Sequence, residues 1–426
     1  MYLLIILYML ILLLEGTLGL QPIAEFSDFS LSYNLLFLIL INLTFFLRFI
    51  VKPHSIPIYN EILLYYAGIL LTFIPVILFQ SHLVPGGMSL MLQFILQSLL
   101  LLILYKTLYR KALNRLYQFL IIFAFVNCAI VYASYLFPYV FDGIAEVHGY
   151  FGYNDSDPER IIRAFGIMGD LAPWFLSFFS ILYLHLRKYL FSIFYGFTCI
   201  LGASLGATAL LIMALFLFFL LKSKNKVRLI FKSFSLISLV ILLVLAIKPE
   251  LFLDISVVKR IVDPTTFKST SGAQRLYTYG LAINMISNSP FWGSGYGTFL
   301  YNLQSSLGYQ FFNLKFGNGA LSNTNNQFLQ VLYEGGITLF ILFVFMIRRI
   351  LLIFSKYTNW YLMQGKMMEF KKAAFVWFLS LVLMNQTAVW MIPSMIWVLI
   401  VSLIGISLYI NKNIEFYEGN TPYCYY

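Results

Sequence analysis

The chain has 426 residues, of which 61% are hydrophobic, 19% aromatic and only 11% charged. A soluble protein of this composition could not cover its surface with polar groups, so the sequence predicts a polytopic membrane protein. The formal net charge of +11 does not indicate a nucleic-acid partner, because the basic residues lie in short loops between apolar spans. The three cysteines show no disulfide framework and no metal-ligand spacing, so no metal site is expected.

Apolar runs in the first half of the chain predict six membrane-spanning helices. They cover residues 1–20, 31–50, 62–80, 89–105, 116–137 and 166–186. A basic loop between the fourth and fifth spans, from Lys106 to Arg115, is placed in the cytoplasm because short cytoplasmic loops carry excess Lys and Arg. Residues 138–165 then form a first sizeable outer loop.

The apolar stretch 189–221 is too long for one ordinary span and short for two. Arg187 and Lys188 precede it and Lys222 and Lys224 follow it, so both of its ends are expected in the cytoplasm. An even number of crossings is then required. We predict two short, closely packed helices joined by a tight outer turn at residues 202–206.

The second half of the chain contains four more features. Residues 231–247 form a span that ends at the outer face, and residues 248–326 form the largest loop there. Residues 328–347 form the span that returns to the cytoplasm, and residues 373–389 and 394–410 form a final hairpin of two spans. The predicted fold class is an all-α integral membrane protein of about twelve transmembrane helices with both termini in the cytoplasm. Its large extracytoplasmic loop lies between the ninth and tenth helices. We treat residues 1–426 as a single polytopic membrane domain with outer loops 138–165 and 248–326.

The end of the large loop carries the most informative pattern. A helix is predicted from residue 271 to 288, ended by Pro290, and a glycine-rich turn at residues 291–297 follows it. Steps of three or four place Leu276, Tyr279, Ile283 and Ile286 on the apolar face of that helix, with Arg275, Thr278 and Ser287 off it.

These pieces resemble the large extracytoplasmic loop of the O-antigen ligase and polymerase superfamily. The matching residues are Arg275, the run 288–297, the stretch 325–329 beginning Asn325-Asn326, and Glu334 with the two glycines after it. Many members have a histidine where this chain has Asn325. The resemblance is therefore closest to an O-antigen polymerase, with an O-antigen ligase as the alternative.

The resemblance implies a membrane glycosyltransferase of lipopolysaccharide or other surface polysaccharide biosynthesis. Such a polymerase transfers a glycan from an undecaprenyl diphosphate carrier onto another lipid-linked repeat unit. It works in the bacterial cytoplasmic (inner) membrane, with its active site on the periplasmic face. The implied partners are the lipid-linked oligosaccharide, the lipid bilayer, a chain-length regulator and a flippase, and no cofactor is implied.

The candidate site residues follow from that resemblance together with the chemistry of their side chains. The catalytic candidates are Arg275, Asn325 and Glu334, and the substrate-binding candidates are Arg160, Arg163, Arg260 and Asn326. Arginine offers a fixed fork of donors that suits diphosphate oxygens, although pairing with nearby acids or lipid headgroups is an alternative. A glutamate inside a span is costly and often functional, although it can also serve as a polar partner for a neighbouring helix. The asparagines either bind sugar hydroxyls or cap the following helix.

A transporter, such as a flippase for lipid-linked oligosaccharides, is the alternative from another functional class. A flippase is expected to carry charged residues through its spans and to lack a large loop. This chain has nearly charge-free spans and one long outer loop. Those features favour an enzyme at the outer face.

Overall fold

A computed structural model describes residues 2–18, 23–25, 30–51, 63–64, 66–71, 87–107, 110–137, 171–202, 205–225, 271–296, 298–299, 326–356, 365–384 and 395–420. Within these ranges the chain is helical, in agreement with the predicted all-α class. The exception is one short antiparallel pair, β1 (Ala24–Glu25) and β2 (Ser30–Leu31), in which Ala24 is opposite Leu31. This pair lies between the first two predicted spans.

The first four helices follow the predicted spans. They are α1 (Tyr2–Leu18), α2 (Tyr33–Val51), α4 (Gly87–Thr107) and α5 (Arg110–Leu136). The predicted basic loop between the fourth and fifth spans is wrong in one respect, because α5 already begins at Arg110 and includes Arg115. Of the third predicted span, 62–80, the structure describes only residues 63–64 and 66–71 as helix.

The stretch 189–221 forms two helices, as predicted. After α7 (Ala172–His185), α8 (Tyr189–Leu201) and α9 (Leu205–Lys222) are joined by a turn at Gly202. Every residue of α7 is buried, which fits a helix that is apolar on all sides. Both α8 and α9 pack against α7, so this three-helix group is held together by its central member.

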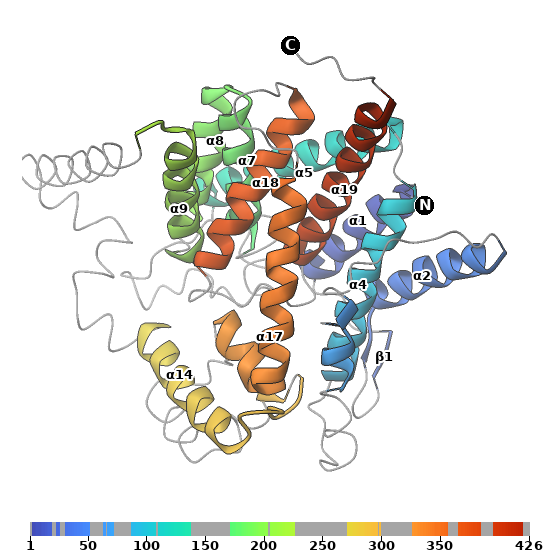
Figure 1. Cartoon of the computed structure of the whole chain (residues 1–426). Coiled ribbons are helices and arrows are strands. Elements are labelled where there is room, and N and C mark those ends of the chain that lie inside the picture. Colours follow the sequence, from blue (N-terminus) through green and yellow to red (C-terminus); the bar gives the residue numbers. More distant parts are fainter. Residues whose placement is uncertain are drawn as a thin grey trace, which may run out of the picture.

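The remaining helices are α14 (Ser271–Asn288), α17 (Gln327–Ser355), α18 (Lys366–Leu383) and α19 (Met395–Asn420). In Figure 1, α17 runs through the middle of the molecule, and α14 lies beside its lower end, away from the other helices. Helices α17 and α19 continue well beyond the predicted span ends at 347 and 410. The glycine turn, which includes residues 290–295, lies against one end of the long central helix α17.

Three helices in the described part of the chain are long and apolar enough to cross a membrane, by length and composition alone. They are Ala112–Leu136, Gln327–Ser355 and Ile396–Asn413, and five shorter apolar helices accompany them. The predicted ninth span, 231–247, and the outer loop 138–165 lie outside the described residues. The total of about twelve spans therefore remains a prediction.

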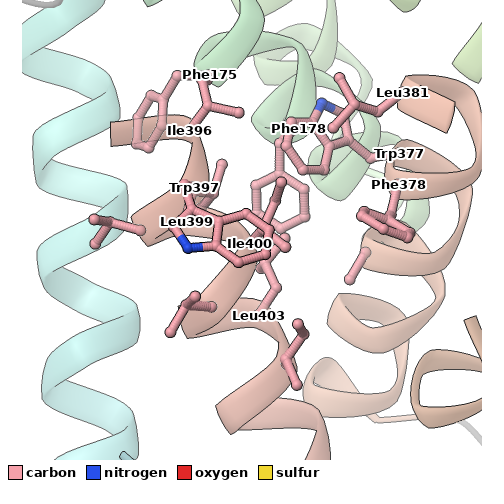
Figure 2. Close-up of a cluster of buried hydrophobic side chains, with 14 of the residues drawn as sticks. Phe175, Phe178, Trp377, Phe378, Leu381, Ile396, Trp397, Leu399, Ile400 and Leu403 are labelled. Atoms are coloured by element: carbon pink, nitrogen blue, oxygen red, sulfur yellow. The ribbon is translucent and has the colours of Figure 1, made fainter. Parts of the chain in front are cut away.

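Two buried tryptophans occupy the apolar core between α4, α7, α18 and α19 (Figure 2). The indole Nε1 of Trp377 donates a hydrogen bond to Ser177 Oγ at 2.9 Å, and that of Trp397 donates to Ser98 Oγ at 2.8 Å. A buried indole N–H needs such a partner, because it cannot reach water. Each serine therefore fixes one tryptophan across a helix pair.

Lys371 is a buried lysine near the start of α18. It lies in α18 with no exposed surface, and its Nζ donates to the Lys356 carbonyl at the end of α17 and to Asn411 Oδ1 of α19. Asn411 Nδ2 in turn donates to Ile353 O at 3.1 Å. The lysine thus supplies a donor to a helix C-terminus, whose last carbonyls lack partners within the helix. Burial first, and then the positive charge of Lys356, lower the pKa of Lys371 to about 8.

This lowered pKa predicts a pH-dependent stability. The ordinary lysine value is 10.5, so between about pH 8 and pH 10 the unfolded chain binds more protons than the folded one, and the free energy of unfolding rises with pH. We expect the thermal midpoint of the detergent-solubilised protein to rise across this window. Lys371→Met should flatten that rise, and Lys366→Met, at an exposed position of the same helix, should preserve it. Equal slopes in the two variants would contradict the assignment.

Candidate functional site

Helix α17 is broken about one third of the way along its length, at Gly336. This residue has φ 62° and ψ −163°, a conformation that is essentially restricted to glycine. In an unbroken helix, the amides of Ile337 and Thr338 would donate to the carbonyls of Tyr333 and Glu334. The break leaves those four main-chain groups without their helical partners.

The turn that follows α14 supplies the missing partners. Ser294 N donates to Tyr333 O at 2.8 Å, and Gly295 N donates to Glu334 O at 2.9 Å. On the other side of the break, Ile337 N donates to Pro290 O at 2.8 Å. Thr338 donates to Phe291 O, through its amide at 3.5 Å and through Oγ1 at 2.9 Å. The turn and the broken helix therefore pair along their main chains.

Two glycines make this close approach possible. A Cβ on Gly293, which has φ 71°, would lie 2.5 Å from the carbonyl carbon of Glu334. A Cβ on Gly336 would lie 2.4 Å from the carbonyl carbon of Phe291. Each glycine thus faces the backbone of the other segment, and neither position can accept a side chain. The predicted need for positive φ in the turn is confirmed at Gly293 and also at Gly295, with φ 102°.

Glu334 projects from the segment that this turn holds. It is 6% exposed, and its Oε1 accepts a hydrogen bond from Gln330 Nε2 at 2.8 Å, one helical turn earlier. Tyr296, at the end of the glycine turn, is also buried. Burial first, and then the negative charge of Glu334, raise the pKa of the Tyr296 phenol well above its ordinary value. The site thus places a carboxylate close to a phenol that keeps its proton at neutral pH.

A small aromatic cluster attaches α14 to the same segment. Tyr333 is fully buried, packs edge to face on Phe299 at 5.1 Å between ring centroids, and shares a hydrogen bond of 2.9 Å with Thr298 Oγ1. Ala282 of α14 packs into this cluster. A small residue at that point lets the two helices approach closely.

The predicted apolar face of α14 is partly wrong as a consequence. Thr278, expected off that face, is fully buried, whereas Ile283, expected on it, is 58% exposed. The contact with Tyr333 selects a face centred on Ala282, and hydrophobicity along α14 alone does not reveal that partner. Arg275 belongs to α14, but its side chain lies outside the part of the chain that the structure describes, so its role in the site stays a prediction.

Of the other predicted site residues, the structure describes one and leaves the rest undescribed. Asn326 is the N-cap of α17, and its Oδ1 accepts hydrogen bonds from Phe328 N at 3.0 Å and Leu329 N at 3.2 Å. That is the capping alternative named above, and a contact of Asn326 with substrate stays a prediction. Four candidates lie outside the described residues: Arg160, Arg163, Arg260 and Asn325.

Sequence reasoning did not single out Gln330 and Tyr296. Gln330 could have been found, because a glutamine four residues before a glutamate, on an otherwise apolar helix, predicts a side-chain pair. Tyr296 gave no such signal, since its proximity to Glu334 depends on the pairing of the turn with the helix break. Among the described residues, no group of three or more His, Cys, Asp or Glu is placed to hold a metal ion.

The glycine contacts predict a strong effect of one methyl group. Gly336→Ala should destabilise the protein by about 1–3 kcal/mol and displace Glu334, because the added Cβ overlaps the Phe291 backbone at a positive φ. The matched control is Gly280→Ala in α14, where a Cβ meets nothing within 4 Å and the helix should be stabilised slightly. Thermal midpoints in detergent and glycan length in cells measure both effects. Wild-type behaviour of Gly336→Ala would show that the break is not required.

Comparison with known proteins finds a family similarity over part of the chain. No curated protein matches the chain. A family model described as O-antigen ligase matches residues 190–344. The matched stretch contains α8, α9, α14, the glycine turn and the broken part of α17 with Glu334. Residues 190–344 are therefore similar to the O-antigen ligase family, which confirms the resemblance to the O-antigen ligase and polymerase superfamily over this part of the chain.

Proposed function

We propose that this protein is a polysaccharide polymerase that transfers a glycan from an undecaprenyl diphosphate carrier onto a second lipid-linked repeat unit. The family domain and the apolar helices support a membrane glycosyltransferase that acts on lipid-linked saccharides. The inner membrane as its location and the periplasmic face as the side of its active site are part of the proposal. So are a chain-length regulator and a flippase as partners.

The observation that carries the proposal is the buried Glu334 carboxylate, held by Gln330 beside the helix break. In the proposed reaction, a hydroxyl of the acceptor sugar attacks the anomeric carbon of the donor. The bond from that carbon to the diphosphate oxygen breaks, and the diphosphate leaves with the electron pair. Glu334 takes the hydroxyl proton as general base. Arg275 stabilises the charge that develops on the diphosphate.

Asn325 bears on the choice between polymerase and ligase. A neutral imidazole can take a proton near pH 7, whereas an amide can only orient a hydroxyl through hydrogen bonds. A ligase that relies on histidine at this position should not tolerate asparagine, and a polymerase that uses a carboxylate elsewhere can. The ligase remains the second candidate, because the matching family model carries that description.

Deletion of the gene separates the two candidates. If the protein is a polymerase, the deletion strain should still attach a single repeat unit to the surface acceptor, because a separate ligase remains active, and long chains should be absent. If it is a ligase, the acceptor should carry no repeat units, and long polymer should accumulate on undecaprenyl diphosphate. Electrophoresis of surface glycan and mass analysis of carrier-linked saccharides distinguish the two results. Polymer trapped on the carrier would overturn the polymerase assignment.

A conservative substitution tests the role of Glu334. In Glu334→Gln the side-chain oxygen can still accept from Gln330 Nε2, so the fold should be kept while the negative charge is removed. We expect a loss of about 100-fold or more in polymerisation at matched protein level, the usual range for removal of a general base. Glu334→Asp, which keeps the charge on a shorter side chain, serves as the control and should retain more activity. Full activity of Glu334→Gln would leave Glu334 as a structural partner of Gln330 only.

A further inference from the structure

Two large aromatic side chains stand exposed on the glycine turn. Phe291 is 63% exposed and Trp292 is 72% exposed. Their backbone is held firmly, since Gly293 N donates to Ser289 O at 3.0 Å and Ser289 Oγ donates to Gly293 O at 2.9 Å. Large apolar side chains on a fixed turn form a surface that needs an apolar neighbour.

The exposed face of α17 continues this apolar surface. Its exposed large hydrophobic residues begin directly after the break and recur on one side of the helix: Ile337, Ile341, Val344, Phe345 and Leu352, each 43–48% exposed. Residues 327–336, before the break, contribute no exposed large hydrophobic side chain. The bond from Thr338 Oγ1 to Phe291 O fixes the aromatic pair at the end of this stripe that lies next to the helix break. A helix face of this kind in a membrane protein faces lipid.

The turn itself cannot lie inside the hydrocarbon region. Irregular backbone that faces lipid does not occur there, because every main-chain group in that region needs a partner within the protein. Asn284, Ser287 and Asn288 at the adjoining end of α14 are exposed and polar. The turn therefore has polar neighbours on one side and the apolar stripe of α17 on the other. Tryptophan is enriched at that boundary, since its ring is apolar and its N–H is polar.

We propose that Phe291 and Trp292 anchor the glycine turn in the lipid–water interface, and that this anchor sets the membrane depth of Glu334. Gly295 of the same turn is hydrogen-bonded to the Glu334 carbonyl, so the carboxylate lies close to the level of the anchor. That level is where the phosphates of membrane lipids lie. As far as catalysis is concerned, the inference rests on the proposed function, because a lipid-linked diphosphate presents its reacting bond at the same depth.

The length of the apolar stripe fits a short membrane crossing. The stripe from Ile337 to Leu352 spans roughly 24 Å, and the exposed Arg348 lies within it, close to its far end. Helices α7 and α8, which pack against each other elsewhere in the bundle, have 14 and 13 residues, or roughly 20 Å each. Arginine near a helix end extends its charged group to the interface, and lipid adjusts to short apolar spans by thinning. A membrane boundary at Gly336 therefore gives α17 an apolar length similar to those of α7 and α8.

Tryptophan fluorescence tests the depth without any activity measurement. The protein is reconstituted into bilayers whose lipids carry bromine near the headgroup or deep in the acyl chains, and iodide is used as an aqueous quencher. The emission of Trp292 is the difference between the wild type and Trp292→Phe. Two reference variants are made in the Trp292→Phe background: Asn284→Trp, at an exposed polar position, and Ile341→Trp, within the stripe.

Trp292 should be quenched most by the shallow bromine, the residue 284 reference most by iodide, and the residue 341 reference most by the deep bromine. Strongest quenching of Trp292 by iodide would place the turn in water, and strongest quenching by deep bromine would place the break within the hydrocarbon. Resistance to all three quenchers would mean that protein covers the aromatic pair. Each of these three results would overturn the proposal. The depth result is independent of polymerase activity, so failure of one proposal can be told from failure of the other.

Discussion

The structure depends on how the main-chain groups at the break in α17 find partners. A buried amide or carbonyl without a hydrogen bond costs about 1–3 kcal/mol, and the break removes four such groups from the helical ladder. All four groups form hydrogen bonds with main-chain groups of the turn, which belong to Pro290, Phe291, Ser294 and Gly295. The glycine turn thus becomes part of the helix that it touches. The side chains around Glu334 owe their positions to that pairing.

The pairing of the turn with the helix break explains how a buried carboxylate can be kept within the otherwise apolar helix α17. A buried charge is unfavourable unless hydrogen bonds or nearby polar groups stabilise it. Glu334 has Gln330 as a donor at 2.8 Å, and the Tyr296 phenol is close enough to respond to its charge. Asn326 lies two turns before Glu334 on the same helix and caps its N-terminus. The polar residues at this end of α17 thus have two different roles. Asn326 stabilises the first turn of the helix, and Gln330 donates a hydrogen bond to the Glu334 carboxylate.

Much of the helical layout could be predicted from the sequence, because apolar length and flanking charge are local signals. The division of 189–221 into α8 and α9 followed from basic residues at both ends, and the positive φ of Gly293 followed from the glycine pattern. The buried face of α14 could not be predicted, because Tyr333 selects it from about fifty residues further along the chain. The burial of Lys371 could not be predicted for a similar reason, since its acceptors belong to α17 and α19.

The pairing of the glycine turn with the broken helix also bears on how this protein can be altered or combined with relatives. Residues 290–295 and 333–338 are separate in sequence, yet they share one set of hydrogen bonds and two reciprocal glycine contacts. A chimaera that exchanges the outer loop alone, or the spanning helix alone, joins a turn and a break that were not shaped for each other. The smallest unit that can be exchanged intact is therefore the end of the loop together with the first turns of α17, up to and including the break.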